Sequence, residues 1–318
     1  FLTPLSNNIK DKNYNLFYKS SNSLLKFRNI FLNLFILNKI LNNGNIKNNI
    51  LYVDGYSLYD LASILFSSFK NNFKLIIYVR HLYKNTFKDL IFILLIKILK
   101  KNCYTFTILT DTQILKKYLN NQFFCKILLL PIPHTLSNSQ IRKKIKNNKI
   151  KIWCPGPIRK EKYGEKLDLF IRNNSNYKFN LSLSKNYKNI TKLENIKFKK
   201  LKSNMNRVEY EKEFYKNDLI VLPYQSDQYE EKTSGIFVES ISIAKLILVS
   251  DKTWMSNELI KNNLRELIVK DWNKFDLKSF FEKLDVIKIN KKLKKMKYKY
   301  INFHNEKNFI NILSHAIK

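Results

Sequence analysis

Glycine and proline are scarce in this sequence, which holds 5 Gly and 6 Pro in 318 residues. The sequence also shows no internal repeat and no low-complexity tail. Apolar residues make up 45% of it, enough for buried cores, and the length suggests about two domains. Because glycine is so rare, the place of each one in the sequence is informative.

Cysteine is also rare. Cys103, Cys125 and Cys154 form no metal-type spacing, and each lies in or beside an apolar run. Their odd number and their setting predict buried free thiols in a reducing compartment. No secretory signal is visible, and the longest apolar stretch, Leu90 to Leu99, is too short to span a bilayer, which takes about 20 residues. We therefore expect a cytoplasmic protein.

Acidic residues and arginine are few, whereas lysine is abundant. The chain has 25 Asp and Glu against 58 Lys and Arg, a net charge of +33, and only seven of the basic residues are Arg. High Lys, Asn and Ile together indicate AT-rich codon usage, so we interpret the lysines as solvated and spread over all surfaces. A nucleic-acid-binding protein usually has a basic stripe, often with Arg, and it stays the alternative from another functional class.

One segment keeps a membrane contact open as an alternative. Thr86 to Lys101 has an apolar body surrounded by Lys88, Lys97 and Lys100. This composition is compatible with peripheral binding at the anionic inner face of a membrane. The favoured interpretation is a helix that packs on the core and has a solvated edge.

Strand-like apolar runs alternate with helical segments along the chain, which predicts an α/β protein with open parallel sheets. In the first half, strands are expected at Ile50–Val53, Leu75–Val79, Thr105–Leu109 and Lys126–Leu130. Helices are expected there at Ser23–Leu41, Leu58–Phe69, Thr86–Lys100 and Gln113–Asn120.

The same alternation restarts in the second half. Strands are expected at Lys151–Cys154, Lys178–Leu183, Ile196–Leu201, Asp218–Leu222 and Leu246–Ser250. Helices are expected at Lys160–Asn173, Arg207–Lys216, Gly235–Ala244, Ser256–Asn262, Lys278–Leu284 and Tyr300–Lys318.

These patterns divide the chain into four parts. We expect one α/β domain in residues 1–140, a linker in 141–150, a second α/β domain in 151–299 and a final helix in 300–318. The polar stretch Ser137–Lys149 marks the linker. The chain begins with Phe1 rather than Met, and its first four residues resemble the end of a strand, so we expect a truncated first strand.

The nine residues from Glu231 to Glu239 carry the clearest functional signal. Two carboxylates bracket Thr233, Ser234 and Gly235, between a strand-like and a helical run. The first turn of a helix offers unpaired amides and partial positive charge, which suit a phosphate, and glycine lets that phosphate approach the backbone. Carboxylates suit sugar hydroxyls. The combination predicts a nucleotide-sugar site, although an ordinary helix cap explains Ser234 alone.

A second cluster follows the strand expected at Lys151–Cys154. A turn containing Gly156 leads to Arg159 and Lys162 at the start of a helix. Cations there oppose the helix dipole unless an anion binds, and Arg and Lys are common phosphate contacts. A solvated side chain would explain Lys162 in so lysine-rich a chain; it explains Arg159 less readily.

A third candidate, His81, follows the strand expected at Leu75–Val79. Ligands of such folds lie beyond the carboxyl ends of the strands, so we expect His81 to face the cleft from the first domain. It could contact a transferred sugar or take a proton from an acceptor. A hydrogen-bonded structural histidine fits the sequence equally well.

Taken together, these residues resemble the retaining GT-B glycosyltransferases of the large "group 1" class. The E-x7-E run from Glu231 to Glu239 resembles their signature, and Arg159 to Lys162 resembles their R-x-E-K-G phosphate loop. The continuation Ala244–Asp251 resembles the helix–strand sequel G-K-P-V-V-x-S. In three places the chain departs from the pattern: Tyr163 and Ala244 stand where Gly is usual, and Leu246 where Pro is.

The resemblance implies two Rossmann-like domains that face each other across a cleft. The first would bind the acceptor, the second the nucleotide sugar, and the final helix would return to the first domain. The glycine-rich loop expected after the first strand is not recognisable, and Ser6 to Asn8 are what remains at its place. The absence of a D-x-D run fits a class that needs no divalent metal and no other cofactor.

The resemblance also implies a role for each site residue. Arg159 and Lys162 would neutralise the leaving diphosphate of a UDP- or GDP-linked sugar. The start of the helix at Ser234 would bind that diphosphate through its amides. Glu239 would hold the ribose hydroxyls, and Glu231 the donor sugar. The acceptor, a glycan or a lipid-linked molecule, would attack from the face that the leaving group departs from.

Two relatives of the same fold remain as alternatives. A nucleotide-sugar epimerase would need acidic and His residues from both domains around one small substrate. A catalytically inactive protein with this fold would retain the architecture without the chemistry. Both would share the predicted fold class, and only activity measurements separate them from a transferase.

Overall fold

The computed structural model describes residues 23–42, 50–54, 57–82, 86–133, 150–187, 193–202 and 205–317. The chain forms two compact units. The first comprises residues 1–110, 115–128 and 315–318, and the second comprises 111–114 and 129–314. The expected first strand, the segment Ser6 to Asn8 and residues 141–149 of the expected linker lie outside the described residues, whereas Ile150, the last residue of that linker, belongs to a strand.

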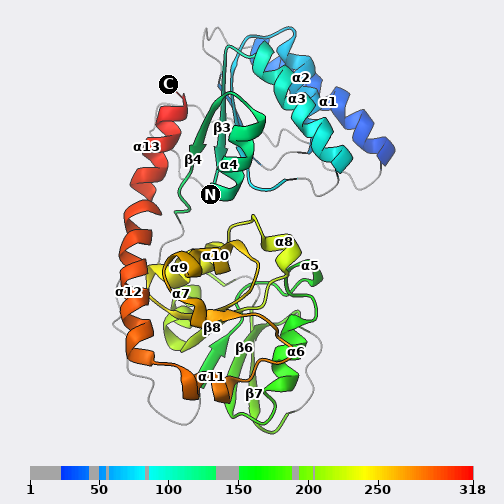
Figure 1. Ribbon diagram of the computed structural model, residues 1–318. Helices are drawn as coiled ribbons and strands as arrows, with labels where there is room; N and C mark the ends of the chain where they lie inside the picture. Colours follow the sequence, from blue (N-terminus) through cyan, green and yellow to red (C-terminus); the bar gives the residue numbers. More distant parts are fainter. Residues whose placement is uncertain are drawn as a thin grey trace. The chain divides into compact units, whose positions relative to one another are not determined.

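The first unit is a parallel sheet of four strands in the order β1-β2-β3-β4. Its strands are β1 (Ile50–Asp54), β2 (Lys74–Val79), β3 (Thr105–Thr110) and β4 (Lys126–Leu129). Its helices are α1 (Ser23–Asn42), α2 (Leu58–Ser68), α3 (Thr86–Asn102) and α4 (Gln113–Gln122). Each of the last three connects two neighbouring strands, so the unit is a simple β-α-β succession (Figure 1).

The second unit contains a parallel sheet of six strands in the order β10-β9-β8-β5-β6-β7. Its strands are β5 (Ile150–Trp153), β6 (Phe179–Ser184), β7 (Ile196–Leu201), β8 (Leu219–Leu222), β9 (Leu246–Ser250) and β10 (Ile268–Val269). Its helices are α5 (Lys160–Tyr163), α6 (Lys166–Asn173), α7 (Arg207–Lys216), α8 (Ser226–Tyr229), α9 (Gly235–Ser242), α10 (Trp254–Lys261), the 3-10 turn η1 (Arg265–Leu267), α11 (Leu277–Lys283), α12 (Val286–Phe303) and α13 (Glu306–Ile317).

The strand order places a topological switch at β5 and β8. The chain moves outward from β5 through β6 to β7, and then returns to the other side of β5 as β8. Loops that leave the carboxyl ends of β5 and β8 therefore diverge and leave room for a ligand between them. All four residues of β8 are buried, which matches a central strand covered on both faces.

The predicted α/β class with two parallel sheets is confirmed, and the predicted strands agree with the observed ones to within one or two residues. Two helix predictions are wrong. The single helix expected over Lys160–Asn173 is interrupted at Gly164, whose φ of 52° ends α5. The single helix expected over Tyr300–Lys318 is instead the end of α12, which begins at Val286, followed after a break at His304 and Asn305 by α13.

Ala244, which stands where the resembling family has Gly, adopts a φ of 52°. The turn between α9 and β9 thus needs the left-handed conformation that glycine adopts freely and that costs other residues about 1–2 kcal/mol. Ala244 therefore adopts, at the cost of some backbone strain, a conformation that glycine would adopt freely.

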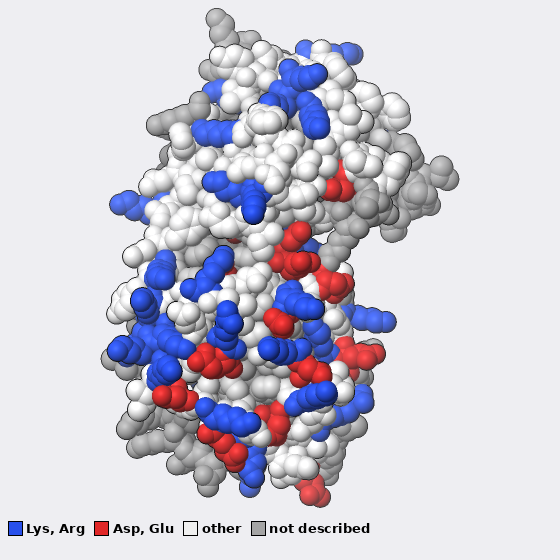
Figure 2. Space-filling model, viewed as in Figure 1, with Lys and Arg blue, Asp and Glu red and all other residues white. Residues whose placement is uncertain are grey.

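The net positive charge is not gathered in one stripe on the second unit. On the face drawn in Figure 2, Lys and Arg alternate with Asp and Glu over this unit. This distribution agrees with the interpretation of solvated lysines. Among the described helices, none combines the length and apolar character needed to cross a membrane.

A buried histidine marks the break between α12 and α13. The ring Nδ1 of His304 accepts a hydrogen bond from the backbone N–H of Ile132 at 3.0 Å, and the ring packs against Tyr300. Burial lowers the pKa of His304 to about 4. The ring is therefore neutral at physiological pH, as an acceptor at Nδ1 requires.

This histidine makes the stability of the protein pH-dependent. An unfolded histidine titrates near about 6.5, so the unfolded chain takes up a proton first as the pH falls. The stability contributed by neutral His304 is present above about pH 6.5 and is lost as the pH falls towards 4, by up to about 3 kcal/mol. Urea unfolding of wild type and His304→Gln at pH 7 and pH 5 should show a smaller pH effect in the variant.

The matched control is His315→Gln, which removes an exposed imidazole of α13. It is expected to retain the wild-type difference between pH 7 and pH 5. Equal pH effects in wild type and His304→Gln would contradict the assignment.

Candidate functional site

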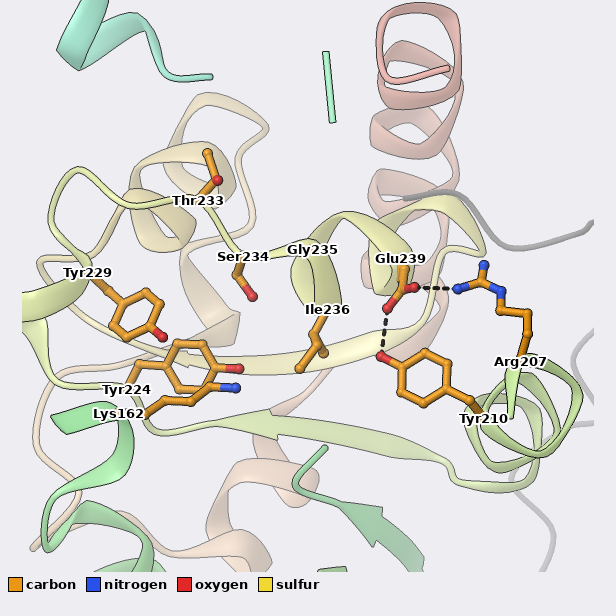
Figure 3. A pocket seen from close by; sticks show the side chains of 10 residues that line it. All are labelled: Lys162, Arg207, Tyr210, Tyr224, Tyr229, Thr233, Ser234, Gly235, Ile236 and Glu239. Atoms are coloured by element: carbon orange, nitrogen blue, oxygen red, sulfur yellow. Dashed lines mark hydrogen bonds and ion pairs between the residues drawn. The ribbon is translucent and has the colours of Figure 1, made fainter. Parts of the chain in front are cut away.

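The second unit contains a pocket of about 440 Å³ at the carboxyl ends of its central strands. Its wall combines the start of α9, the end of α5, the first turn of α7 and the loop after β8 (Figure 3). The lining residues are Lys162, Arg207, Tyr210, Tyr224, Tyr229, Thr233, Ser234, Gly235, Ile236 and Glu239.

The start of α9 forms the middle of the wall. Ser234 is the N-cap, and its hydroxyl accepts a hydrogen bond from the N–H of Phe237 at 3.3 Å. A helix leaves its first amides without intrahelical partners, and those of Gly235 and Ile236 lie at the pocket. The helix dipole adds partial positive charge there, so this part of the wall favours an anion.

Glu239 lies one turn into α9 and is buried, with 3% of its surface exposed. One carboxylate oxygen accepts a hydrogen bond from Arg207 Nη1 at 2.8 Å, and the other accepts one from the Tyr210 hydroxyl at 2.6 Å. Each oxygen of an ionised carboxylate can accept a second hydrogen bond. The two donors therefore fix the orientation of Glu239 and leave acceptor capacity for a ligand.

Both donors are themselves held by α7. Asn206 caps this helix through a reciprocal pair of hydrogen bonds with Glu209. Arg207 is anchored by a second ion pair, from Nε to Glu211 at 2.7 Å. The ring of Tyr210 packs edge-on against Trp153 at the end of β5, with centroids 5.4 Å apart. The Glu239 clamp is thus tied to the sheet.

Lys162 forms the other charged end of the pocket. Its ammonium lies 4.5 Å from the ring centroid of Tyr224 and 5.4 Å from that of Tyr163. In the described part of the chain no carboxylate pairs with it. Burial, followed by the charge of Arg159, lowers the pKa of Lys162 to about 8. A half-buried cation held against aromatic faces, with no carboxylate partner among the described residues, is suited to an anionic ligand.

Two loops are joined to hold this end in place. The carbonyl of Lys162 accepts from the N–H of Gln225 at 2.9 Å, and Lys166 Nζ donates to the carbonyl of Tyr224 at 2.9 Å. These bonds link the loop after β5 to the loop after β8. A Cβ on Gly164 would lie 1.4 Å from the side-chain Nε2 of Gln225, so this side chain would have to move, and the φ of 52° of Gly164 is strained for any other residue.

Tyr163, another departure from the family pattern, closes the first of these loops. Its side chain is fully buried, and its hydroxyl donates to the carbonyl of Pro155 at 2.7 Å. The ring also packs edge-on against Tyr224. The rings of Tyr163 and Tyr224 therefore pack against each other and against the ammonium of Lys162.

The hydroxyl of Tyr224 is buried at the pocket and has no hydrogen-bond partner among the described residues. Burial raises the pKa of Tyr224 well above its ordinary value, so the group remains a neutral donor. An unsatisfied buried donor beside Lys162 is typical of a site completed by a ligand or by water.

Five of the nine predicted site residues line the pocket: Lys162, Thr233, Ser234, Gly235 and Glu239. Gly156 lies directly beneath Lys162. The Thr233 hydroxyl donates to Asp111 at 2.6 Å, within the same unit.

Like Gly156, three further predicted residues lie outside the lining. Arg159 occupies the exposed N-cap position of α5, and Glu231 lies half-buried in the loop before α9. His81 is exposed after β2, in the first unit.

Sequence reasoning missed Arg207, Tyr210, Tyr224 and Tyr229. Arg207 could have been singled out, because it is one of seven arginines and begins a helix directly after an Asn cap. The tyrosines gave no such signal in a chain with 18 of them. Among the described residues, no group of three or more His, Cys, Asp or Glu is placed to hold a metal ion.

Neither a protein-family model nor a curated protein matches the sequence. Solved structures match in fold. A trehalose-6-phosphate synthase from Burkholderia multivorans aligns with a TM-score of 0.64 and 8% identity over 94% of this chain and 77% of its own. The trehalose-6-phosphate protein of E. coli, bound with UDP-2-fluoro glucose, aligns with a TM-score of 0.63 and 9% identity over 92% and 78%.

TarM aligns with a TM-score of 0.58 and 11% identity over 91% of this chain, which spans 58% of TarM. This chain has the GT-B fold. The GT-B architecture accounts for the two parallel sheets, and the described pocket lies in the second GT-B unit. At these identities the similarity concerns the fold alone.

Replacing Gly156 tests how this GT-B unit supports Lys162. Gly156 has a φ of 88°, and a Cβ there would lie 3.2 Å from Lys162 Nζ and 3.4 Å from Ile236 Cδ1. Gly156→Ala should lower the unfolding free energy by about 1–2 kcal/mol because of the strained backbone. Urea unfolding measures the effect.

Gly235→Ala is the matched control, because Gly235 begins a helix and its φ is not positive. Alanine there should leave stability unchanged or raise it by up to about 1 kcal/mol. Unaltered stability in Gly156→Ala, or equal losses in both variants, would contradict the role of the Gly156 backbone.

Proposed function

We propose that this protein is a retaining glycosyltransferase, hexosyltransferase-like and metal-independent, that moves a sugar from a nucleotide-sugar donor to a glycan or lipid-linked acceptor. The observation that carries the proposal is one pocket with three matched parts. It has a half-buried cation with no carboxylate partner among the described residues, the open start of a helix and an oriented buried carboxylate.

The first two parts suit the diphosphate of the donor. Lys162 supplies a positive charge whose field is strengthened by burial, and the amides of Gly235 and Ile236 supply donors from the helix end. Figure 3 shows the Lys162 side chain directed towards the start of α9. A diphosphate between them would also give the Tyr224 hydroxyl the acceptor that it lacks.

The third part suits a ribose. A carboxylate fixed by two donors can accept the hydroxyls of a vicinal diol without losing its orientation. Glu239 lies on the opposite side of the α9 start from Lys162 (Figure 3), so a nucleoside diphosphate fits with its phosphates at Lys162 and its ribose at Glu239. The E. coli structure with UDP-2-fluoro glucose makes UDP the first nucleotide to test.

The roles of the remaining predicted residues follow from the resemblance. Arg159 would join Lys162 on the leaving diphosphate, and Glu231 would hold the transferred sugar. His81 would contact that sugar or the acceptor. Negative charge develops on the phosphate oxygen as the glycosidic bond breaks, and preorganised cations and amides stabilise it, each such contact being worth on the order of 10²-fold in rate.

A donor screen tests the proposal directly. UDP-, GDP- and ADP-sugars should be assayed for hydrolysis and for thermal stabilisation of the protein, since a ligand that binds the folded state raises its apparent stability. Turnover of one of them, with a product of the donor's anomeric configuration by NMR, is the expected result. An inverted product contradicts retention, and a lack of both binding and turnover contradicts the proposal.

Binding of a nucleoside diphosphate should weaken as the pH rises past the pKa of Lys162. That pKa is about 8 in the free protein, so Lys162 is charged at pH 7 and about one tenth charged at pH 9. Calorimetry with UDP should show an affinity about 10-fold lower at pH 9 than at pH 7. Lys162→Met should bind weakly at both pH values.

Lys160→Met is the control, since Lys160 is an exposed lysine of the same short helix. It should retain the affinity of wild type and its pH dependence. A pH dependence that persists unchanged in Lys162→Met contradicts the assignment of the cation.

Glu239→Gln should separate the two ends of the pocket. Loss of a charge-assisted hydrogen bond to the ribose costs about 1.5–3 kcal/mol, or about 10- to 100-fold in UDP affinity. Pyrophosphate has no ribose, so its affinity should not change. Lys162→Met should weaken both ligands.

Circular dichroism and thermal unfolding must accompany the measurement, because Glu239 also anchors Arg207 and Tyr210. A folded Glu239→Gln protein that binds UDP like wild type contradicts the ribose role. Equal weakening of UDP and pyrophosphate contradicts it as well.

A further inference from the structure

The helices α1, α2 and α3 of the first unit form one layer. Both α2 and α3 connect neighbouring parallel strands in sequence order, and the right-handed rule for such crossovers places them on the same face of the sheet. Asn38 of α1 accepts a hydrogen bond from Ser67 of α2 at 2.9 Å, and Asn102 of α3 donates to Ser68 at 3.2 Å. In Figure 1 the three helices lie side by side.

Each helix of the layer already buries an apolar stripe against the core. In α3 this stripe is Phe92, Ile96 and Leu99, all with 1% exposure or less. Leu37 of α1 and Ile64 of α2 are buried in the same cluster. The favoured interpretation of α3 as a core-packed helix is therefore correct for one of its faces.

The opposite faces of these helices are apolar too. On α3, Phe87, Leu90 and Leu94 are 69%, 64% and 58% exposed, at spacings of three and four residues. On α1, Phe31 and Phe35 are 71% and 69% exposed. The fold does not need these side chains for its core, and large exposed apolar patches usually mark an interaction site.

The middle helix contributes to the same surface. Phe66 is about half exposed, and Phe69, at the end of α2, is exposed to 64%. Together with the five exposed residues already named on α1 and α3, they form an apolar surface that we call the helical face. It comprises Phe31, Phe35, Phe66, Phe69, Phe87, Leu90 and Leu94.

The charges around the helical face have one sign. The exposed charged residues of these three helices and of the turn after α2 are Arg28, Lys39, Lys70, Lys88, Lys97 and Lys101. The only acidic residues of the helices have other functions. Asp60 is buried and caps α2, and Asp89 accepts a hydrogen bond from Tyr118. This differs from the second unit, where both signs alternate (Figure 2).

We propose that the helical face docks on the surface of an anionic phospholipid membrane. Phenylalanine and leucine side chains would enter the boundary between headgroups and acyl chains, and the lysines around them would contact lipid phosphates. Each lysine near such a surface contributes about 1 kcal/mol, or about 5-fold in binding. The lack of any exposed acidic residue on these helices removes the repulsion that would oppose docking.

Charge alone would also attract nucleic acid, but the apolar residues decide between the two. Nucleic-acid backbones bind through counter-ion release at phosphates and offer no apolar layer for seven large side chains. A membrane surface supplies both an anionic layer and an apolar one.

Flotation of the full chain with vesicles tests the proposal. The protein should float with phosphatidylcholine vesicles that contain phosphatidylglycerol and not with phosphatidylcholine alone. Lys97→Glu/Lys101→Glu should lower the vesicle partition coefficient by about 25-fold or more. Leu90→Gln/Leu94→Gln should lower it by at least about 10-fold, because two buried leucines are lost.

Matched controls lie on α12 of the second unit. Lys291→Glu/Lys295→Glu changes the net charge by the same amount at exposed positions, and Ile287→Gln removes an isoleucine that is 85% exposed. Both should float like wild type. Thermal unfolding must show that every variant is folded.

The proposal is overturned if wild type does not float with anionic vesicles, or if the helical-face variants float like wild type. Sedimentation equilibrium without lipid supplies a further check. If wild type is a dimer and Leu90→Gln/Leu94→Gln is a monomer, a second copy of the chain covers the helical face instead. Because the donor assays do not involve this face, their failure and the failure of flotation are distinguishable.

Discussion

The buried carboxylate of Glu239 sets the arrangement of α7 and α9. A carboxylate so deeply buried is tolerated only if hydrogen-bond donors replace its water. Arg207 and Tyr210 supply those donors from α7. Since Tyr210 also packs on Trp153, the same clamp connects the first turn of α9 to β5. The clamp therefore adds a polar link between α7 and the first turn of α9, beside the apolar packing of Phe237, Val238 and Ile241 that also holds this helix.

The other end of the pocket holds the half-buried cation Lys162, which has no carboxylate partner in the part of the chain that the structure describes. Its ammonium lies against the rings of Tyr163 and Tyr224. Burial, followed by the charge of Arg159, lowers the pKa of Lys162. Glu239 and Lys162 thus lie on either side of the N-terminus of α9, and only Glu239 has strong hydrogen-bond donors around it. In the proposed function, the anionic end of the ligand lies at Lys162 and its hydroxylated end at Glu239.

The fold class was predictable because its strands are continuous apolar runs separated by helical segments. The run of α12 was missed because its lysines conceal an apolar stripe, Ile289, Leu293, Met296 and Tyr300, whose spacing of four, three and four residues is helical. Of the residues that line the pocket, Lys162, Thr233, Ser234, Gly235 and Glu239 were predictable from local sequence. The contacts of Arg207 and Tyr210 with Glu239 were not, since they arise only when α7 packs on the sheet.

Lysine has different functions in different parts of this chain, and its neighbours decide which. Lys162 is half-buried against aromatic rings. Lys245 is buried and donates a hydrogen bond to the carbonyl of Asn217. On the second unit many others alternate with carboxylates. On α1–α3 exposed lysines accompany exposed phenylalanines, and these three helices carry no exposed acidic residue. A net charge of +33 therefore says little by itself. Only where the charge of one sign coincides with an apolar surface does it indicate a partner, and that partner must be both anionic and apolar.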